Sequence, residues 1–367
     1  MDRTCLAAAI AGALAVPLGV QAEVIVYGVA HVSVDSLDND GAGLDAQGRP
    51  VGAQDGAFVS SNESRLGFKG SENLSGGLDV IWQIESEVNL DEGGNGEDDD
   101  GLASRNSFVG LRGGWGTVLA GRHDTPMKLL ANNIDLFDEQ IGDSSNILRN
   151  RRAGADGDPV LFGFDERPSN AVAYVSPRFA GMQGMVLYSI AREDDAADGR
   201  DEGDLVSASL AYDNGPVWVS AAYESHDKEL TGGNERETGW RLGASYDMGR
   251  LKVTGLYQQL RDLGGVSGAD RDAWGLGGAL AFGANVLKAQ WYRADDLDTV
   301  SDSGADMWVV GVDHDFSRRT TAYIAYAKAD NDAAADFSIA ASEHGADLTS
   351  AAGSDPSGFS LGLIHRF

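Results

Sequence analysis

Cysteine, positive charge and long apolar runs are all scarce in this chain of 367 residues. Its single cysteine, Cys5, excludes an internal disulfide framework and a cysteine-ligated metal site. Lysine and arginine number 28 against 57 aspartates and glutamates, so the formal net charge is −29, and nucleic acid is not an expected partner because its phosphates would be repelled. Beyond residue 22 no stretch reaches the roughly 18–20 apolar residues of a membrane-spanning helix. Helical periodicity is also hard to find there.

The first 22 residues have the composition of a secretory signal peptide. Arg3 precedes an apolar run over residues 6–20, and the small-residue motif of a cleavage site ends at Ala22. We therefore expect residues 1–22 to be removed, taking the cysteine with them and leaving one domain over residues 23–367. The removed segment carries one acid and one base, so the net charge stays at −29.

Short segments of alternating polarity dominate the rest of the chain. In the stretch ESRLGFKGSENL, Leu66 and Phe68 share one face of a strand, while Arg65 and Lys69 share the other. About 16 such segments follow one another, and an even number of segments near ten residues long is typical of a transmembrane β-barrel. In a membrane barrel the apolar face meets lipid, whereas in a soluble sheet it faces the core, and the period of two is the same in both cases.

The connections between these segments alternate in length. Short turns such as GGWG, DNGP, DMGR and FGAN alternate with long acidic stretches, which cover residues 37–57, 91–101, 124–166, 193–204 and 331–355. Short turns at one rim and long loops at the other are typical of a barrel whose ends face two compartments. Closure also pairs every strand edge, as lipid requires. We therefore expect an all-β, antiparallel transmembrane barrel of 16 strands.

Aromatic side chains gather near the ends of the segments, as in the interface girdles of membrane barrels. They include Tyr174, Tyr212, Trp240, Tyr246, Trp274, Phe282, Phe316 and Phe367. The stretch FSLGLIHRF likewise places alternate apolar residues, from Phe359 to Phe367, on one face. These patterns favour lipid on the outside of the barrel.

Three stretches carry a resemblance to a known family. EVIVYG at 23–28, SRLGFKGSENLSGGL at 64–78 and SRNSFVGLRGGWGTVLAGR at 104–122, together with Phe367, resemble general diffusion porins of Gram-negative bacteria. The resemblance runs in order over essentially the whole chain beyond residue 22. It implies a 16-stranded barrel in the outer membrane, with short periplasmic turns, long extracellular loops and a third loop, at about 124–166, folded into the lumen.

The resemblance also implies partners and an orientation. Porins of this kind are usually homotrimers, and the final aromatic, here Phe367, belongs to the signal that the barrel-assembly machinery reads. It further implies that Leu66 and Phe68 face lipid while Arg65 and Lys69 face the lumen.

The lumen-facing charges are the candidate site. Alternation puts a basic group on the early strands and their ends: Arg65, Lys69, Arg105, Arg122 and Arg167. The resemblance implies that the arginines matching Arg65, Arg105 and Arg167 form one wall of a constriction. The inward loop supplies candidate acids opposite them, and alternation adds two more acids to the lumen face: Asp135, Asp138, Glu139 and Asp143 in the loop, and Glu85 and Glu87 on a strand. Opposed charges across a narrow wet gap create a transverse field that orients polar solutes.

The acidic stretches are relevant to metal binding and to the ion preference of a channel. DEGGNGEDDDG and DSLDNDGAGLDA superficially resemble calcium loops, but the first is a single copy of a motif that acts as a repeat and the second lacks the closing glutamate of an EF-hand. We therefore expect no metal site and no cofactor, but solvated extracellular loops that divalent cations can bridge to lipopolysaccharide. Negative charge near the mouth predicts a modest cation preference, opposed by the arginines.

Enzyme signatures are lacking. The sequence has no H-E-x-x-H and no G-x-S-x-G motif, and its six histidines are scattered. We expect a passive channel for small hydrophilic solutes and ions, and not an enzyme. Three alternatives stay open: a substrate-specific channel, a barrel enzyme with a His–Ser pair on its lipid-facing wall, and a structural or adhesive barrel with a plugged lumen. His31 and His226 fall on the lumen face, which disfavours the enzyme.

Overall fold

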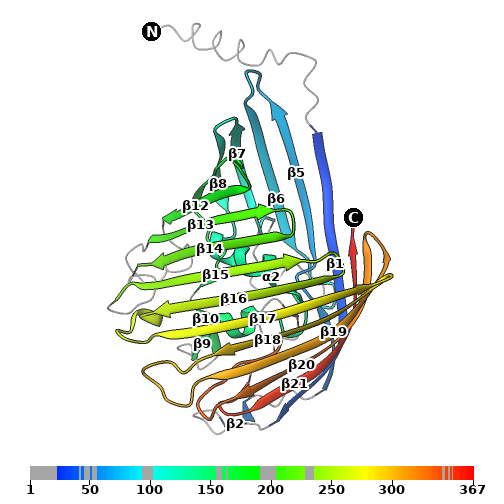
Figure 1. The fold of residues 1–367 in the computed structure, drawn as a ribbon, viewed down its shortest axis with the longest axis vertical. Coiled ribbons are helices and arrows are strands. Elements are labelled where there is room, and N and C mark those ends of the chain that lie inside the picture. Colours follow the sequence, from blue (N-terminus) through cyan, green and yellow to red (C-terminus); the bar gives the residue numbers. More distant parts are fainter. Residues whose placement is uncertain are drawn as a thin grey trace.

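The chain forms a single closed β-barrel (Figure 1). The computed structural model describes residues 23–40, 43–44, 50–51, 56–92, 102–153, 159–162, 164–190, 204–227, 235–340, 344–345, 348 and 350–367. Within them, one sheet of 17 strands closes when its last strand pairs with its first, and β4 and β5 both pair with β1 as two halves of one interrupted strand. The barrel therefore has 16 strands, as the sequence predicts. The signal-peptide prediction for residues 1–22 and most of the acidic stretches at 91–101 and 193–204 lie outside the described residues.

The barrel strands run antiparallel to their neighbours. The first eight in chain order are β1 (Glu23–Asp40), β4 (Gly56–Ser61), β5 (Arg65–Asn73), β6 (Asp79–Glu87), β7 (Ser107–Gly113), β8 (Gly116–Arg122), β11 (Ala171–Val175) and β12 (Met182–Ile190). The others are β13 (Asp204–Asn214), β14 (Val217–His226), β15 (Glu237–Asp247), β16 (Leu251–Arg261), β17 (Arg271–Phe282), β18 (Asn285–Ala294), β19 (Ala305–Ser317), β20 (Thr320–Asn331) and β21 (Asp355–Arg366). Two short hairpins lie apart from this sheet: β2 (Gly43–Leu44) with β3 (Pro50–Val51), and β9 (Asn150–Ala153) with β10 (Pro159–Phe162).

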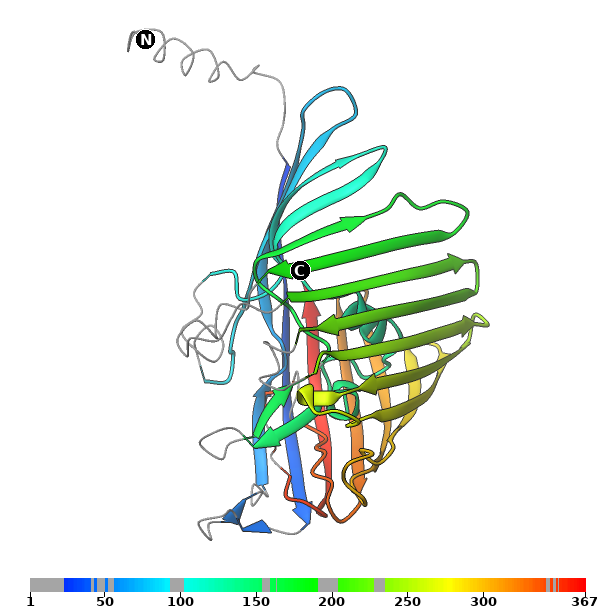
Figure 2. The ribbon, with the colours of Figure 1, turned by 90° about the vertical axis from the view of Figure 1, so that its left-hand side faces the viewer.

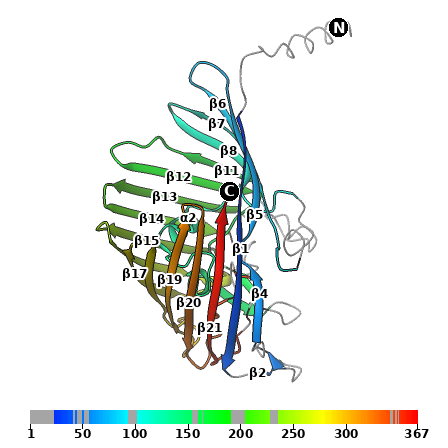
Figure 3. The same cartoon turned by 90° about the vertical axis from the view of Figure 1, so that its right-hand side faces the viewer.

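Closure joins strands from the two ends of the described chain. β1 runs beside β21 from the pair Val29 and Arg366 to the pair Asp40 and Asp355 (Figures 2 and 3). Beyond this ladder Gly28 and Phe367 exchange two backbone hydrogen bonds, each 3.1 Å long. The sheet therefore has no open edge at this seam, as a barrel in lipid requires.

The outer surface of the barrel is apolar. Leu66 and Phe68 are exposed, as expected for side chains that face lipid, and in β19 Trp308 and Val310 are more than half exposed. Aromatic rings pair across neighbouring strands, as Tyr257 does with Trp274 at a centroid distance of 4.4 Å. The alternation that the sequence predicts is confirmed, with lipid-facing apolar side chains at every second position.

The connection between β8 and β11, residues 123–170, folds into the barrel where it is described and is called the inward loop below. It contains two helices, α2 (Pro126–Ile134), which lies inside the ring of strands against β13–β16, and the short α3 (Ser145–Leu148), which contacts β18 (Figure 1). A 3₁₀ turn, η2 (Leu263–Gly265), follows β16. No helix among the described residues is long and apolar enough to cross a membrane.

The start of α2 follows from its sequence. Thr125 caps the helix by accepting a hydrogen bond from the Lys128 N–H (3.2 Å), and a proline occupies the first turn. The buried face has the spacing i, i+3, i+4 and i+7 of an amphipathic helix, with Met127, Leu130, Ala131 and Ile134. This short helical period was not expected from the sequence because it lies within one long connection.

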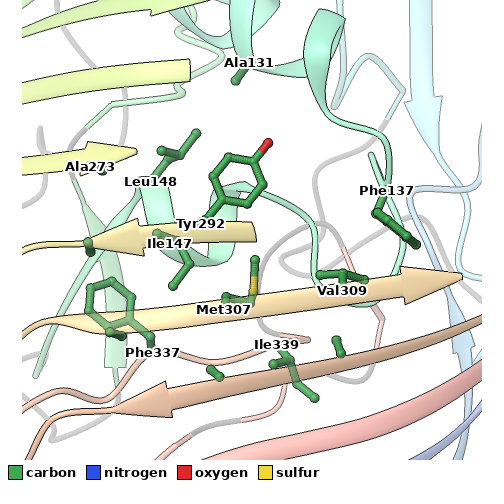
Figure 4. Close-up of a cluster of buried hydrophobic side chains, with 14 of the residues drawn as sticks. Ala131, Phe137, Ile147, Leu148, Ala273, Tyr292, Met307, Val309, Phe337 and Ile339 are labelled. Atoms are coloured by element: carbon green, nitrogen blue, oxygen red, sulfur yellow. The ribbon is translucent and has the colours of Figure 1, made fainter. Parts of the chain in front are cut away.

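The inward loop packs against an apolar part of the lumen. We call this surface the covered wall; it comprises the lumen faces of β16–β20, with Leu256, Ala273, Tyr292, Met307, Val309, Ala325, Ala327 and Ala329 (Figure 4). Phe137, Ile147 and Leu148 of the loop are buried against it. Each such large apolar side chain contributes about 1.5–3 kcal/mol when fully buried. The barrel thus has an internal hydrophobic core.

A second connection, residues 332–354 between β20 and β21, also folds inward where it is described. Phe337 and Ile339 join the same core (Figure 4), and the Ile339 carbonyl accepts a hydrogen bond from the Gly142 N–H of the inward loop at 2.7 Å. The length and acidity of this stretch predict an outer loop, and its contact with the lumen was not expected from the sequence.

Candidate functional site

The candidate constriction lies where the inward loop meets strands β5 and β6. We call this second surface the charged wall: the lumen faces of β5 and β6 and the segment 102–106, with Arg65, Lys69, Glu85, Glu87 and Arg105. Arg65 Nη1 donates a hydrogen bond to Glu139 Oε1 at 2.5 Å and a second one to the Glu63 carbonyl at 3.0 Å. A predicted wall arginine and a predicted loop acid are therefore in direct contact across the lumen.

Arg105 is held between two carboxylates. Its Nε donates to Glu85 Oε1 at 3.0 Å, and its Nη1 forms an ion pair with Glu63 Oε2. Glu85 in turn accepts a hydrogen bond from the Tyr27 hydroxyl at 2.8 Å. The Arg105 side chain is only 8% exposed, so these partners fix its position.

A third arginine, Arg167, forms an ion pair with Asp124 and so joins the two ends of the inward loop. Arg167 Nε donates to Asp124 Oδ1 at 2.8 Å, and Asn106 also donates to Asp124, at 2.7 Å. Burial alone would raise the pKa of Asp124, but the charges of Arg167 and Lys128 and the Asn106 hydrogen bond outweigh it and hold that pKa below its usual range. Asp124 therefore remains ionised and ties the start of the loop to its end.

The predicted loop acids do not all face the same way. Asp135 accepts hydrogen bonds from the backbone N–H groups of Phe137 and Ser144, and Asp143 accepts from those of Glu139 and Ser145. These two carboxylates stabilise the turn after α2, and burial raises the pKa of Asp135. Asp138, like Glu139, interacts electrostatically with Arg65.

Lys69 and Arg122 lie outside the Arg65–Arg105 cluster, whereas Glu87 is the cross-strand neighbour of Arg65. Lys69 is four residues along β5 toward the short turn, with its Nζ 4.6 Å from the centre of the Tyr27 ring. Arg122, at the end of β8, donates to the Ser169 hydroxyl at 3.0 Å. Glu87 accompanies Glu85 on β6, and its backbone N–H donates to the Ser104 hydroxyl.

Polar anchors hold the inward loop on the side of the covered wall, and our sequence analysis missed them. The fully buried Arg241 of β15 forms a two-pronged ion pair with Asp165 and donates to the Met127 carbonyl at 3.0 Å. On β18, Gln290 bonds to the backbone of Leu136 and Gly142, at 3.1 Å in each case. The sequence signal for these anchors was the presence of charged and amide side chains at lumen-facing positions of the later strands.

The chemistry of this site is that of fixed charges. Arg65 and Arg105 face Glu63, Glu85 and Glu139, with part of the Arg65, Glu63 and Glu139 side chains still accessible to solvent. Among the residues that the structure describes, no three His, Cys, Asp or Glu side chains are grouped so as to hold a metal ion. Such an array can orient and select permeating solutes by charge.

Known proteins are similar to this chain in sequence and in fold. The family model described as Gram-negative porin matches residues 4–334. Outer membrane porin protein 32 of Delftia acidovorans is 29% identical over 274 residues, covering 72% of each chain. The major outer membrane protein P.IB of Neisseria meningitidis serogroup B is 30% identical over 251 residues, covering 67% of each chain.

Solved structures agree with the barrel. The anion-selective porin from Comamonas acidovorans superposes with a TM-score of 0.75 at 25% sequence identity, covering 95% of this chain and 100% of that one. The Salmonella typhi OmpF complex with daunomycin superposes with a TM-score of 0.62 at 14% identity, covering 94% and 98%, which is a likeness of fold alone. The closed 16-stranded barrel, its lipid-facing exterior and the family match together show that this chain is an outer-membrane channel protein that belongs to the Gram-negative porin family.

Proposed function

We propose that the protein is a passive diffusion channel for small hydrophilic solutes and ions, and not an enzyme. The observation that carries this proposal is the contact between Arg65 of the charged wall and Glu139 of the inward loop, inside a barrel whose exterior is apolar. The contact brings fixed charges of both signs to the place where the loop narrows the lumen. Small polar solutes can align their dipoles in such a field, whereas apolar solutes gain nothing from it.

We further propose a modest preference for cations. The net charge of −29 and the excess of three glutamates over two arginines around Arg65 and Arg105 support it. The opposite preference is the second candidate, because a similar solved structure is titled an anion-selective porin. The sign of the reversal potential in a salt gradient decides between the two.

Planar-bilayer recording tests the channel and its basic wall together. We expect the purified protein to give discrete conductance steps, and Arg65→Ala and Arg105→Ala each to raise the cation-to-anion permeability ratio by about threefold, because one positive charge is lost near the path. Arg112→Ala is the matched control, since Arg112 pairs with Asp79 at the short-turn end of the barrel. Unchanged conductance and selectivity in both constriction variants would rule out the proposed wall, and a wild type that passes no current would rule out the channel.

The alternatives make different predictions for the same preparation. A substrate-specific channel would show saturable flux for one solute, whereas a diffusion channel sorts solutes by size and charge. A structural barrel with a plugged lumen would give no conductance steps. His226 is bonded to Glu224 and Glu237 inside the barrel, an arrangement that offers no support for a His–Ser pair on the lipid face.

Partners and processing belong to the same proposal. We propose a homotrimer in the outer membrane, outer loops bridged to lipopolysaccharide by divalent cations, removal of residues 1–22, and recognition of Phe367 by the barrel-assembly machinery. Cross-linking in native membranes tests the trimer, and N-terminal sequencing of the membrane protein tests the cleavage. Truncation of Phe367 should lower the amount of assembled barrel.

A further inference from the structure

The strand formed by β4 and β5 contains one extra residue beside the constriction. Val32 of β1 lies opposite Ser61, and Val29 lies opposite Arg65. Two residues of β1 therefore face the three residues 62–64, which is the arrangement of a β-bulge. The Asn62 N–H and the Ser64 hydroxyl both donate to the His31 carbonyl at 2.9 Å, so the backbone stays paired across the irregularity.

The bulge changes which alternate positions face the lumen. In β4 the even-numbered Ser60 is fully buried while Val59 is 58% exposed to the lipid side. In β5 the odd-numbered Arg65 faces the lumen while Leu66 faces outward. Without the extra residue, uninterrupted alternation would turn Val59 inward together with Arg65. The insertion therefore lets the strand keep an apolar exterior above and below the constriction.

Glu63 is the middle residue of this bulge and has a left-handed backbone, with φ of 51°. A non-glycine residue in this conformation is uncommon, and bulges often redirect a side chain beside a functional site. Glu63 contacts both wall arginines: its carboxylate pairs with Arg105, and its carbonyl accepts from Arg65 at 3.0 Å. Its side chain remains 16% exposed.

Glu63 is one of the carboxylates that determine the local charge. The carboxylates of Glu63, Glu85 and Glu139 pair with the two arginines, and Asp138 and Glu87 lie near Arg65, so the loss of Glu63 makes the local formal charge less negative by one unit. We infer that Glu63, positioned by the bulge, is a selectivity-determining residue of the channel that offsets the attraction of Arg105 and Arg65 for anions. This inference rests on the proposed channel function and names the residue that tunes it.

The test removes the charge in two ways. Glu63→Gln keeps the shape of the side chain, and Glu63→Gly keeps the left-handed backbone, which glycine adopts freely. In a KCl gradient both variants should shift the permeability ratio toward chloride by about threefold at low salt, with a smaller shift near 1 M salt because screening shortens the reach of the charge. Glu72→Gln is the matched control, with the same charge change on β5 close to the short turn; it should leave the ratio unchanged.

The outcomes separate this inference from the function on which it rests. A conducting wild type with a shift in both Glu63 variants and none in Glu72→Gln supports the assignment. A conducting wild type with the shift missing from either Glu63 variant overturns the role of Glu63 and leaves the channel intact, as does an equal shift in the control. A wild type without current overturns both.

Discussion

The charged wall and the covered wall are two parts of one lumen surface, made from the same kind of alternating strand. On the charged wall the inward positions hold Arg65, Lys69, Glu85 and Glu87. On the covered wall the same positions hold small or apolar residues, such as Ala325, Ala327 and Ala329 of β20. The lumen face is therefore largely apolar where the inward loop packs against it, apart from polar anchors such as Gln290, and it is charged at the candidate constriction.

The two walls also have different roles: the covered wall holds the inward loop in place, and the charged wall acts on permeating ions. The covered wall and the neighbouring strand β15 bind the inward loop through buried apolar contacts and the buried Arg241–Asp165 ion pair, whereas the charged wall meets the loop through partly exposed charges. Buried contacts are expensive to break, and exposed pairs contribute little. Substitutions on the covered wall should loosen the loop, while those on the charged wall should change which ions pass.

The largest effect is expected from the buried ion pair of the covered side. Asp165→Asn leaves the fully buried Arg241 without its carboxylate partner, and breaking a buried pair in this way costs about 3–5 kcal/mol. Asparagine tolerates the left-handed backbone of Asp165, with φ of 76°, so the change isolates the charge. We expect protease cleavage within the inward loop of the folded barrel. Arg178→Ala, which breaks an exposed pair with Asp213, should produce none.

A slightly smaller effect is expected from the apolar contact. Phe137→Ala removes a fully buried ring that lies beneath the Lys288 ammonium, at a cost of about 3 kcal/mol in the docking of the loop. Single-channel recordings should show larger and noisier open-channel currents. Phe282→Ala makes the same change on the outer surface and should leave the current unaltered. Identical traces from the two variants would contradict the idea that the covered wall holds the loop in place.

The smallest effect is expected from a fall in pH, which protonates Asp124 and weakens its ion pair with Arg167. The pKa of Asp124 is lowered in the folded protein, so its contribution to stability is present above the pKa of about 3.9 of an unperturbed aspartate and disappears as pH falls through the folded value. Conductance should therefore be steady from neutral pH down to about pH 4 and become less stable below it. Asp124→Asn should show the low-pH behaviour already at pH 7. An Asp124→Asn variant with steady conductance at pH 7 would show that the Asp124–Arg167 pair does not hold the loop.

Alternation let the sequence predict the barrel because each strand repeats the same contrast between its two faces. It also placed Arg65 and Glu85 on the lumen side, where the structure has them in the charged cluster. The contact between Arg65 and Glu139 was foreseen only as two facing groups of charge, since no local pattern gives the path of a 48-residue connection across the lumen, from residue 123 to residue 170.

Alternation could not predict the covered wall or the role of Glu63, because both depend on contacts between residues that are distant in the sequence. The strands of the covered wall have apolar residues on both faces, as in TAYIAYAKA at 321–329, but such a pattern does not indicate which loop packs against the inner face. Glu63 was on the predicted lumen face, yet its importance depends on the register of β1 against two strand halves. A register cannot be read from one strand alone.

The seam between β1 and β21 has a consequence for biogenesis. Gly28 obtains its backbone partners from Phe367, so no shorter N-terminal piece of the chain contains the strand that completes the ring. During synthesis the growing sheet would expose β1 at one side and its newest strand at the other, and unpaired edges of this kind join with other chains. Pairing of such distant segments is also slow. The ring can therefore close only once β21 is available to pair with β1.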